Sequence, residues 1–424
     1  MAGDWKYLYL PLTDGKPPLF MWLTALAMKV LPLSDPLFVG RLVSVFAGFF
    51  AMLGVYFAAR QLFDDKKIAY LSSFFYLISS FTFFYDRFAL ADSLLAMWGI
   101  WSLGLGVLLV KTLNVKVAVL LGVVLGLGWL TKTPAEFFIV LLPILIVLRP
   151  KSIIRYVALL LLAAAIARGI YMLLFLLPQA YVINLKSYEF VVPLSQFLKN
   201  PLQFFPGNAR ALTLWEIQYL TWPIVALIVI SLIRISRQKI ILLTYFLSLF
   251  FFMSLFNKVI YPRFLLMFTP MLLILAAAGL SDLKKFAPVV LVAVLILPAY
   301  TNYKLLTDPV HAPIADTDSK QYLNSWSAGF GVKELNNFFA GKKVTVGVEG
   351  TFGLMPYALE LYQKDHPDLT IKPYWPMPEA LPPGLDYFVV YQHPSAPPTW
   401  KVSLVEQFQE GSGKDYLKLY KIEK

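Results

Sequence analysis

Residues 85–110 read YDRFALADSLLAMWGIWSLGLGVLLV. A charged segment, Tyr85–Asp92, leads into an apolar run that carries no further charge. A helix that crosses the hydrocarbon core of a bilayer needs about 20 apolar residues. Residues 88–110 meet that length, so this stretch predicts a membrane-spanning helix that begins at a charged turn.

The rest of the chain has the same apolar character. Of its 424 residues, 58% are hydrophobic, and the mean hydropathy is +0.66. Soluble globular proteins are less apolar, so we expect an α-helical polytopic membrane protein. The length rule predicts about ten transmembrane helices, at residues 38–61, 67–84, 88–110, 116–132, 134–148, 153–177, 213–233, 239–257, 262–281 and 286–302.

The formal net charge is +12, and we interpret the positions of the basic residues through membrane topology. No nucleic-acid fold signature accompanies it, so nucleic acid is excluded as a partner and the lipid bilayer is expected instead. Basic residues cluster in alternate short loops, which the positive-inside rule places in the cytoplasm. We therefore predict a multi-pass protein of the cell membrane, with the other loops and the last hundred or so residues on the exterior side.

The sequence indicates no cofactor. Cysteine is absent, and all three histidines lie in the C-terminal part. A thiolate or histidine metal centre in the membrane is therefore not expected, and a divalent metal stays open without being indicated.

Two domains are expected, a transmembrane domain at residues 1–302 and an exterior domain at 303–424. Within the first, residues 1–37 are predicted to form an exterior loop and an interfacial helix, and residues 178–212 an exterior loop with short surface helices. Residues 17–32 could instead form a first transmembrane span.

Composition becomes polar and rich in Pro and Gly after residue 302. This part predicts a small α/β domain of three to five strands, with a helix at 354–364 and a hairpin at Gly411-Ser412-Gly413. The β-like runs are residues 343–349, 369–375, 386–391, 401–410 and 415–422.

Several cations lie at predicted helix starts on the exterior side. A helix N-terminus already carries about half a positive charge, so a cation is unfavourable there unless an anion is bound. Helix N-termini and basic side chains together bind phosphate. Snorkelling towards lipid headgroups is the alternative for each one alone. The predicted phosphate-binding residues are Lys16, Arg87, Lys132, Lys258 and Arg263.

Two acids near these cations are the candidate catalytic residues. Asp92 lies inside an apolar helix, where an ionised carboxylate costs on the order of 2.5–3.5 kcal/mol at the membrane centre and needs a cation, a metal or a polar cavity. Asp86 either takes part in the chemistry or caps that helix. Tyr85 and Tyr261 are predicted to line the substrate cavity.

These segments resemble the GT-C membrane glycosyltransferases, the relatives of the protein O-mannosyltransferases and of the lipid A aminoarabinose transferase. The resemblance covers roughly residues 3–280. Residues 14–23, DGKPPLFMWL, resemble the family's D-K-P-P-L-x-x-W-L segment. The other similar segments are RLVS at 41–44, RFALAD at 87–92, GWLTKTP at 128–134 and YPRFLL at 261–266.

The resemblance implies transfer of a sugar from a polyprenyl-phosphate donor to an acceptor at the exterior face, with inversion at the anomeric carbon. Lys16 and Arg263 would hold the donor phosphate, with Lys132 and Arg87 as further candidates. Asp92 would lie beside the reacting sugar or orient a cation. The acceptor could be a protein, a lipid or a glycan.

One part of the family's pattern has no counterpart. The family's usual base is the Asp of an Asp-Glu pair just after the first transmembrane helix, and no residue here matches it. The topology also places the N-terminus outside without a preceding span. We therefore hypothesise that an upstream helix is missing, and this predicts that residues 1–424 alone transfer no sugar.

Two other functions remain open. A lipid or glycan transporter would be favoured by inverted repeats and several intramembrane charges, but the unusual charges lie at one face. A non-catalytic protein that binds polyprenyl phosphate fits the missing base.

Overall fold

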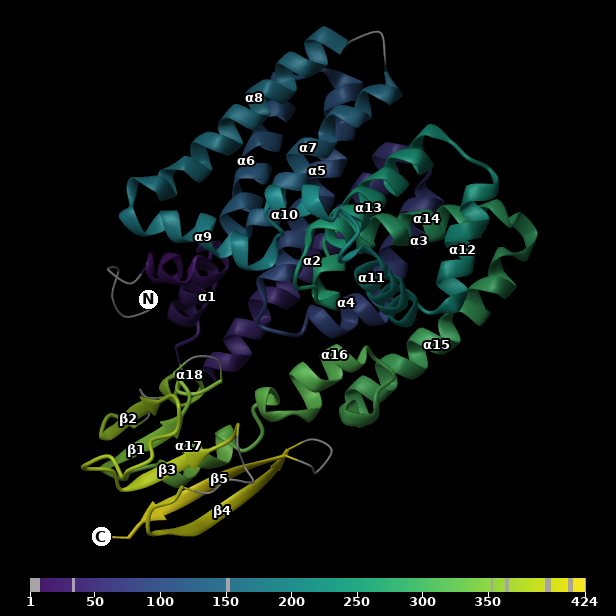
Figure 1. Cartoon of the computed structure of the whole chain (residues 1–424). Helices are drawn as coiled ribbons and strands as arrows, with labels where there is room; N and C mark the ends of the chain where they lie inside the picture. The colour runs from purple at the N-terminus through teal and green to yellow at the C-terminus, as the bar shows by residue number, and fades with distance from the viewer. Residues whose placement is uncertain are drawn as a thin grey trace. The chain divides into compact units, whose positions relative to one another are not determined.

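The computed structural model describes residues 8–32, 35–149, 153–351, 354–362, 366–392, 398–410 and 415–423. The chain divides into two compact units, Met1–Tyr303 and Lys304–Lys424. The first unit is helical and the second contains a β-sheet (Figure 1).

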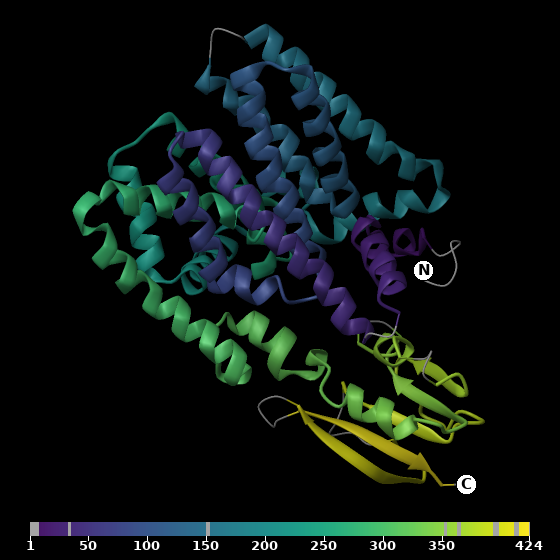
Figure 2. The same ribbon diagram turned by 180° about the vertical axis from the view of Figure 1, so that it is seen from behind.

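The helical unit is built from long helices joined by short turns (Figures 1 and 2). Where a polar side chain precedes a helix, it often caps it, as Asp35 does by accepting from the backbone N–H groups of Leu37 and Phe38. The helices are α1 Leu19–Val30, α2 Pro36–Phe63, α3 Lys66–Ile78, α4 Ser80–Tyr85, α5 Ala91–Thr112, α6 Val115–Thr131, α7 Glu136–Leu141, α8 Ile153–Met172, α9 Tyr181–Phe190, α10 Leu194–Lys199, α11 Phe205–Leu220, α12 Trp222–Ile233, α13 Arg237–Phe256, α14 Thr269–Asp282 and α15 Ala287–Thr307.

The predicted membrane-protein character agrees with these helices, whereas the predicted number of about ten spans is not confirmed. Within the described residues, five helices are long and apolar enough to cross a bilayer, or six when a bent pair counts as one span. Four other apolar helices are shorter, with 10–17 residues. The five are Pro36–Phe63, Ala91–Thr112, Ile153–Leu176, Arg237–Phe256 and Lys284–Thr307.

The span predicted at 213–233 is wrong as a single helix. The chain instead forms α11 and α12, which meet at an angle of 105°. Thr221 lies between them with a φ of 70°, a left-handed conformation that β-branched residues rarely adopt. Pro223 lacks an N–H and its ring would clash with the preceding turn, so the helix cannot continue through it.

Helix α1 is short. Its 12 residues extend about 18 Å at 1.5 Å per residue, which is less than the roughly 30 Å hydrocarbon core. It therefore does not fit the alternative of a first span, and its location at the membrane surface remains a prediction. The loop at 178–212 contains the short helices α9 and α10.

Two helices form the centre of this unit. Every residue of α14 from Thr269 to Leu280 is buried, and 83% of the apolar part of α5 is buried. Gly279 lets α12 approach α14 closely, because a Cβ there would collide with the backbone carbonyl of Leu227. In contrast, only 22% of the apolar part of the helix at Lys284–Thr307 is buried.

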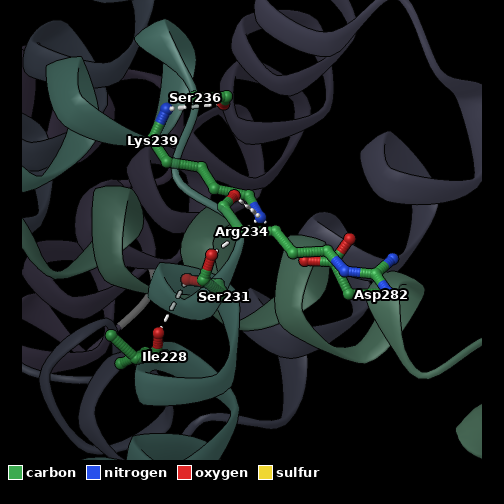
Figure 3. A network of polar contacts seen from close by, with 6 residues as sticks. All are labelled: Ile228, Ser231, Arg234, Ser236, Lys239 and Asp282. Carbon is green, nitrogen blue, oxygen red and sulfur yellow. Dashed lines mark hydrogen bonds and ion pairs between the residues drawn. The ribbon is translucent and has the colours of Figure 1, made fainter.

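A polar network joins α12, α13 and α14 at one end of the unit (Figure 3). The ammonium of Lys239 donates to the carbonyls of Ser231 at 2.7 Å and Arg234 at 2.9 Å, and to the carboxylate of Asp282 at 2.7 Å. Because three donors meet three acceptors, this buried lysine is fully satisfied.

The second unit contains one five-stranded sheet in the order β2-β1-β3-β5-β4. Strands β2, β1 and β3 are parallel, and β5 pairs antiparallel with both β3 and β4. Each strand begins and ends within one residue of a predicted run. The strands are β1 Val344–Glu349, β2 Leu369–Tyr374, β3 Tyr387–Val390, β4 Val402–Glu410 and β5 Asp415–Ile422.

Helix α17, Val332–Phe339, covers this sheet. Its buried residues Val332, Leu335 and Phe339 follow helical spacing and pack with Val346 and Val348 of β1. The helix predicted at 354–364 is represented by the shorter α18, Tyr357–Glu360. The predicted hairpin turn at 411–413 lies outside the described residues.

Candidate functional site

The buried carboxylate of Asp92 is paired with a cation. Asp92 lies in the first turn of α5 and is 5% exposed. Lys132 follows the last residue of α6, and its Nζ lies 2.7 Å from Asp92 Oδ1. Packing of α5 on α6 brings together two residues far apart in the sequence, and Lys132 supplies the cation that a buried carboxylate needs.

An aromatic ring connects this pair to Arg263. The Lys132 ammonium lies 5.1 Å from the centre of the Phe264 ring. The Arg263 guanidinium lies 5.7 Å from the same ring and 4.4 Å from the ring of Tyr261. These distances are within the range of cation–π attraction. Two predicted phosphate-binding residues therefore gather around one side chain.

Lys258 lies at the start of the same segment and is tied to α9. Its Nζ donates to the carbonyl of Tyr188 at 3.1 Å, and its backbone N–H donates to the carbonyl of Phe190 at 2.8 Å. A β-bridge between Val191 and Asn257 adds to this contact. The end of α9 thus holds the beginning of the cationic segment.

Lys16 lies against the other half of α9. Its ammonium forms an ion pair with Asp14 at 2.6 Å, and its side chain is 58% exposed. The turn is tight because Gly15 has a φ of +65° and packs on Val182 and Lys186 of α9. Asp14 is a turn residue, as its sequence context suggests. Helix α9 therefore contacts both the Lys16 turn and the Lys258 segment.

Arg87 lies in the turn between α4 and α5. Its Nε donates to the carbonyl of Phe83 at 2.8 Å, and its guanidinium lies 4.2 Å from that ring. Burial and the positive charge of Arg41 lower the pKa of Arg87. The hydroxyl of Ser44 fixes the turn by donating to the carbonyl of Leu90 at 3.1 Å. Two guanidinium groups that repel one another would be stabilised by an anion.

Asp86 has a different environment from Asp92. Its carboxylate accepts a hydrogen bond from the Tyr76 hydroxyl at 3.0 Å and packs so closely on α2 that a Cβ at Gly48 would collide with it. Burial raises the pKa of Asp86 to about 7, although the nearby hydroxyls of Ser93 and Tyr76 act in the opposite direction. Asp86 is thus enclosed in the protein rather than placed among the cations.

The two tyrosines predicted to line a substrate cavity differ in exposure. Tyr85 is 0% exposed and is enclosed by the rings of Phe81, Phe84 and Tyr219. It has no free surface for a substrate. Tyr261 is half-buried and lies beside Arg263, so it remains a candidate.

Two residues near these cations were missed from the sequence. Phe264 follows Arg263 within the YPRFLL segment. Its contact with Lys132 depends on tertiary packing, so the sequence gives no sign of it. Glu216 is buried in α11, with 6% exposure. The signal for Glu216 was present, since it is a carboxylate inside a predicted apolar span.

The candidate residues form no metal site that the described part of the chain shows, and they do not line either of the two cavities given below. Within the described ranges, no group of three or more His, Cys, Asp or Glu could hold a metal ion. A cavity of about 430 Å³ is lined by residues 282–286. Another, of about 180 Å³, is lined by apolar residues of α6, α7, α8 and the 3₁₀ helix Leu142–Leu148. The cations rather than a deep cavity define the candidate site.

Comparison with known families places part of this site within a recognised sequence region. The family model described as dolichyl-phosphate-mannose-protein mannosyltransferase matches residues 15–192. This range contains Lys16, Asp86, Arg87, Asp92 and Lys132. A search of curated proteins found no match.

Solved structures of glycosyltransferases have a similar fold. ArnT from Cupriavidus metallidurans in the apo state has a TM-score of 0.60 at 16% identity, over 96% of this chain and 88% of that chain. The same protein bound to undecaprenyl phosphate has a TM-score of 0.61 at 16% identity, with equal coverage. The apo oligosaccharyltransferase from Archaeoglobus fulgidus has a TM-score of 0.50 at 15% identity, over 89% of this chain and 62% of that chain. The fold is similar to that of ArnT, and the resemblance to GT-C membrane glycosyltransferases is confirmed.

Proposed function

We propose that this chain is an integral-membrane glycosyltransferase that takes a sugar from a polyprenyl-phosphate donor and passes it to an acceptor at the exterior face. In the reaction, an acceptor hydroxyl oxygen bonds to the anomeric carbon while the bond from that carbon to the phosphate oxygen breaks. The hydroxyl proton goes to a base, and polyprenyl phosphate leaves. Attack from the side opposite the phosphate inverts the anomeric carbon.

The observation that carries this proposal is the group of cations around Phe264 and α9. Lys132 and Arg263 lie beside one ring. Lys258 donates to the carbonyl of Tyr188 in α9, and the turn that carries Lys16 packs on the same helix. A phosphate becomes a good leaving group when donors neutralise the charge that develops on it. We therefore assign these four cations to the donor phosphate, with Arg87 near its edge.

The contacts of Asp92 favour orientation of a cation over direct chemistry. Its carboxylate binds the Lys132 ammonium, so Lys132 is held in place. Asp86 is enclosed beside Tyr76 and would support the turn that carries Arg87. We assign neither carboxylate the role of the base that deprotonates the acceptor.

Location and partners follow from the same reasoning. Residues 303–424 would form the exterior domain of a cell-membrane protein, and the transmembrane domain would bind a donor built on undecaprenyl phosphate or a similar lipid. Support for this class of lipid comes from ArnT, which has a similar fold and whose structure has been solved bound to undecaprenyl phosphate.

Binding of undecaprenyl phosphate by the detergent-solubilised protein tests the phosphate role. Replacing Arg263 by Ala should weaken binding by about tenfold or more, since a charge-assisted hydrogen bond contributes about 1.5–3 kcal/mol. Arg263→Lys should recover part of the affinity, because lysine keeps the charge but not the fork of donors. Arg237→Ala is the matched control, since Arg237 is exposed and, among the described residues, donates to one backbone carbonyl, that of Val147, at 3.2 Å. Unchanged affinity in Arg263→Ala would count against the phosphate site.

A non-catalytic polyprenyl-phosphate-binding protein is the second candidate. It is favoured by the ion pair that the Asp92 carboxylate forms with Lys132, and no other carboxylate is assigned the role of the base. Release of radiolabelled sugar from a polyprenyl-phosphate donor in membranes distinguishes the two. The enzyme releases sugar in the presence of acceptor, which would overturn the inactivity that the unmatched base predicts for residues 1–424 alone, whereas the binding protein retains donor without release.

A further inference from the structure

Helix α11 presents two polar side chains to the segment that carries Arg263. Asn208 and Glu216 lie eight residues apart in α11, or about two turns, so they face the same side of the helix. Each makes hydrogen bonds to a different end of the chain between α13 and α14.

Asn208 holds the beginning of this segment. Its Nδ2 lies 2.8 Å from the carbonyl oxygen of Asn257, 3.1 Å from that of Met253 and 3.5 Å from that of Ser254. These are carbonyls of the last turn of α13 and of the residue after it, where the helix supplies few backbone donors; the carbonyl of Met253 also accepts from the backbone N–H of Asn257 at 3.3 Å. The amide therefore closes α13 and sets where the following residues begin.

Glu216 holds the other end. Its Oε1 lies 3.2 Å from the hydroxyl of Thr269, the first residue of α14. That hydroxyl also lies 3.0 Å from the carbonyl of Leu265, the last residue of the 3₁₀ helix Pro262–Leu265. It can donate to either oxygen, so one hydroxyl links α11, α14 and the turn that carries Arg263.

The buried position of Glu216 calls for an explanation. It is 6% exposed, and its Oε2 has no hydrogen-bond partner among the described residues. A buried carboxyl group is costly, and an apolar side chain of similar volume would be at least as good for stability. A role other than stability accounts for its presence.

We propose that Asn208 and Glu216 position residues 258–268 so that Arg263 and Lys258 meet the phosphate. The inference rests on the proposed function and adds to it two positioning residues outside the cation cluster. A segment held at both ends by one helix has few conformations to lose when a ligand binds, which preserves affinity.

The affinity for undecaprenyl phosphate, measured together with the unfolding temperature in detergent, tests this role. Glu216→Leu should lower the affinity by about tenfold, comparable to the loss of one or two hydrogen bonds, while the unfolding temperature stays equal or rises. Thr269→Val should lower the affinity to a similar extent, but its unfolding temperature should fall because Glu216 loses the hydroxyl that donates to it. Thr269→Ser keeps the hydroxyl and should bind like the wild type. Asn208→Ala should also lower the affinity.

The controls separate this proposal from the phosphate site itself. Thr213→Val, at an exposed position of α11, removes a hydroxyl that donates only to the carbonyl of Ala209 at 2.8 Å and should change nothing. Glu216→Leu combined with Thr269→Val should bind no more weakly than either alone, because both break one link.

Two results would overturn the inference. If Arg263→Ala weakens binding while Glu216→Leu and Thr269→Val do not, the phosphate site stands and the positioning role is refuted. If Glu216→Leu loses affinity only in proportion to a lower unfolding temperature, the role of Glu216 is structural. Wild-type affinity in Arg263→Ala refutes the proposed function instead.

Discussion

Two Lys–Asp ion pairs in the helical unit have the same N–O distance, but the lysine is the more buried partner in one and the aspartate in the other. The Lys239–Asp282 pair and the Lys132–Asp92 pair each measure 2.7 Å. In the first the lysine side chain is 6% exposed and the aspartate 28%. In the second the lysine is 28% exposed and the aspartate 7%.

The partners of each ammonium explain this difference. Lys239 donates to Asp282 and to two carbonyls at the end of α12 (Figure 3), where the helix dipole also favours a cation. Lys132 donates to Asp92 and otherwise faces the Phe264 ring. An ammonium has three donors. Lys239 uses all three, whereas among the described residues the Lys132 ammonium donates to Asp92 alone, which leaves donors for a ligand. The Lys239–Asp282 pair therefore stabilises the packing of α12, α13 and α14, whereas the Lys132–Asp92 pair positions the Lys132 ammonium for a ligand.

The largest effect is expected from breaking the saturated pair. Lys239→Met should lower the free energy of unfolding by about 3 kcal/mol, because it leaves Asp282 and two carbonyls without their donor. The unfolding temperature of the detergent-solubilised protein measures this. The affinity for undecaprenyl phosphate in the folded fraction should not change.

A double variant that removes both charges of the Lys239–Asp282 pair provides the control. Lys239→Met combined with Asp282→Leu should recover most of the stability, since replacing both members of a buried pair by apolar residues is often neutral. An unchanged unfolding temperature in Lys239→Met alone would show that this network does not fasten α12, α13 and α14.

The next largest effect concerns the pair with free donors. Lys132→Met should weaken the binding of undecaprenyl phosphate by about 10-fold to 100-fold, the contribution of a charge-assisted hydrogen bond. The unfolding temperature should also fall, but less than in Lys239→Met, because the N-terminus of α5 stabilises the remaining Asp92 carboxylate.

A second substitution separates these two effects. Adding Asp92→Asn to Lys132→Met removes the unpaired charge, so the unfolding temperature should recover while the affinity stays low. Recovery of both quantities together would mean that Lys132 has a structural role like that of Lys239.

The sequence predicted the local features of this molecule well. The span expected at 88–110 corresponds to α5, and the five strands follow their predicted runs within one residue. These features depend on apolar length and on β-branched runs, which neighbours in the chain determine. The effect of Pro223 on the helix was not predicted: the span expected at 213–233 is divided into two helices.

The candidate site was less predictable because its contacts are made across helices. The charge of Asp92 indicated that a cation was needed, but only the packing of α5 on α6 identifies Lys132 as that cation. The shared ring of Phe264 and the hydrogen bond from Thr269 to Glu216 likewise join distant residues. Residue types can indicate the chemistry, whereas tertiary structure decides which side chains meet.

A smaller effect, on the pH dependence of stability, is expected from Asp86. Among the described residues its carboxylate has no ion-pair partner, whereas that of Asp92 pairs with Lys132. Burial raises its pKa to about 7, above the unfolded value of about 3.9. Its contribution to stability is therefore present below the unfolded pKa and is lost as the pH rises through 7. Asp86→Asn should make the unfolding temperature less dependent on pH between about 5 and 9, measured against the wild type. Parallel curves for the two proteins would refute the raised pKa.

The smallest effect is expected from an exposed Asp–Lys pair. In the second unit, Asp308 accepts from His311 at 2.9 Å and Lys304 at 3.2 Å, and these hydrogen bonds lower the pKa of Asp308. A lowered carboxyl pKa contributes stability above the unfolded value of about 3.9 and loses it as the pH falls through the folded pKa. Water and salt screen exposed pairs, so Asp308→Asn should leave the unfolding temperature unchanged within error at pH 7 and at pH 3. A loss at pH 7 as large as that of Lys239→Met would mean that burial does not decide how much these pairs contribute, and the contrast between Lys239 and Lys132 would need another explanation.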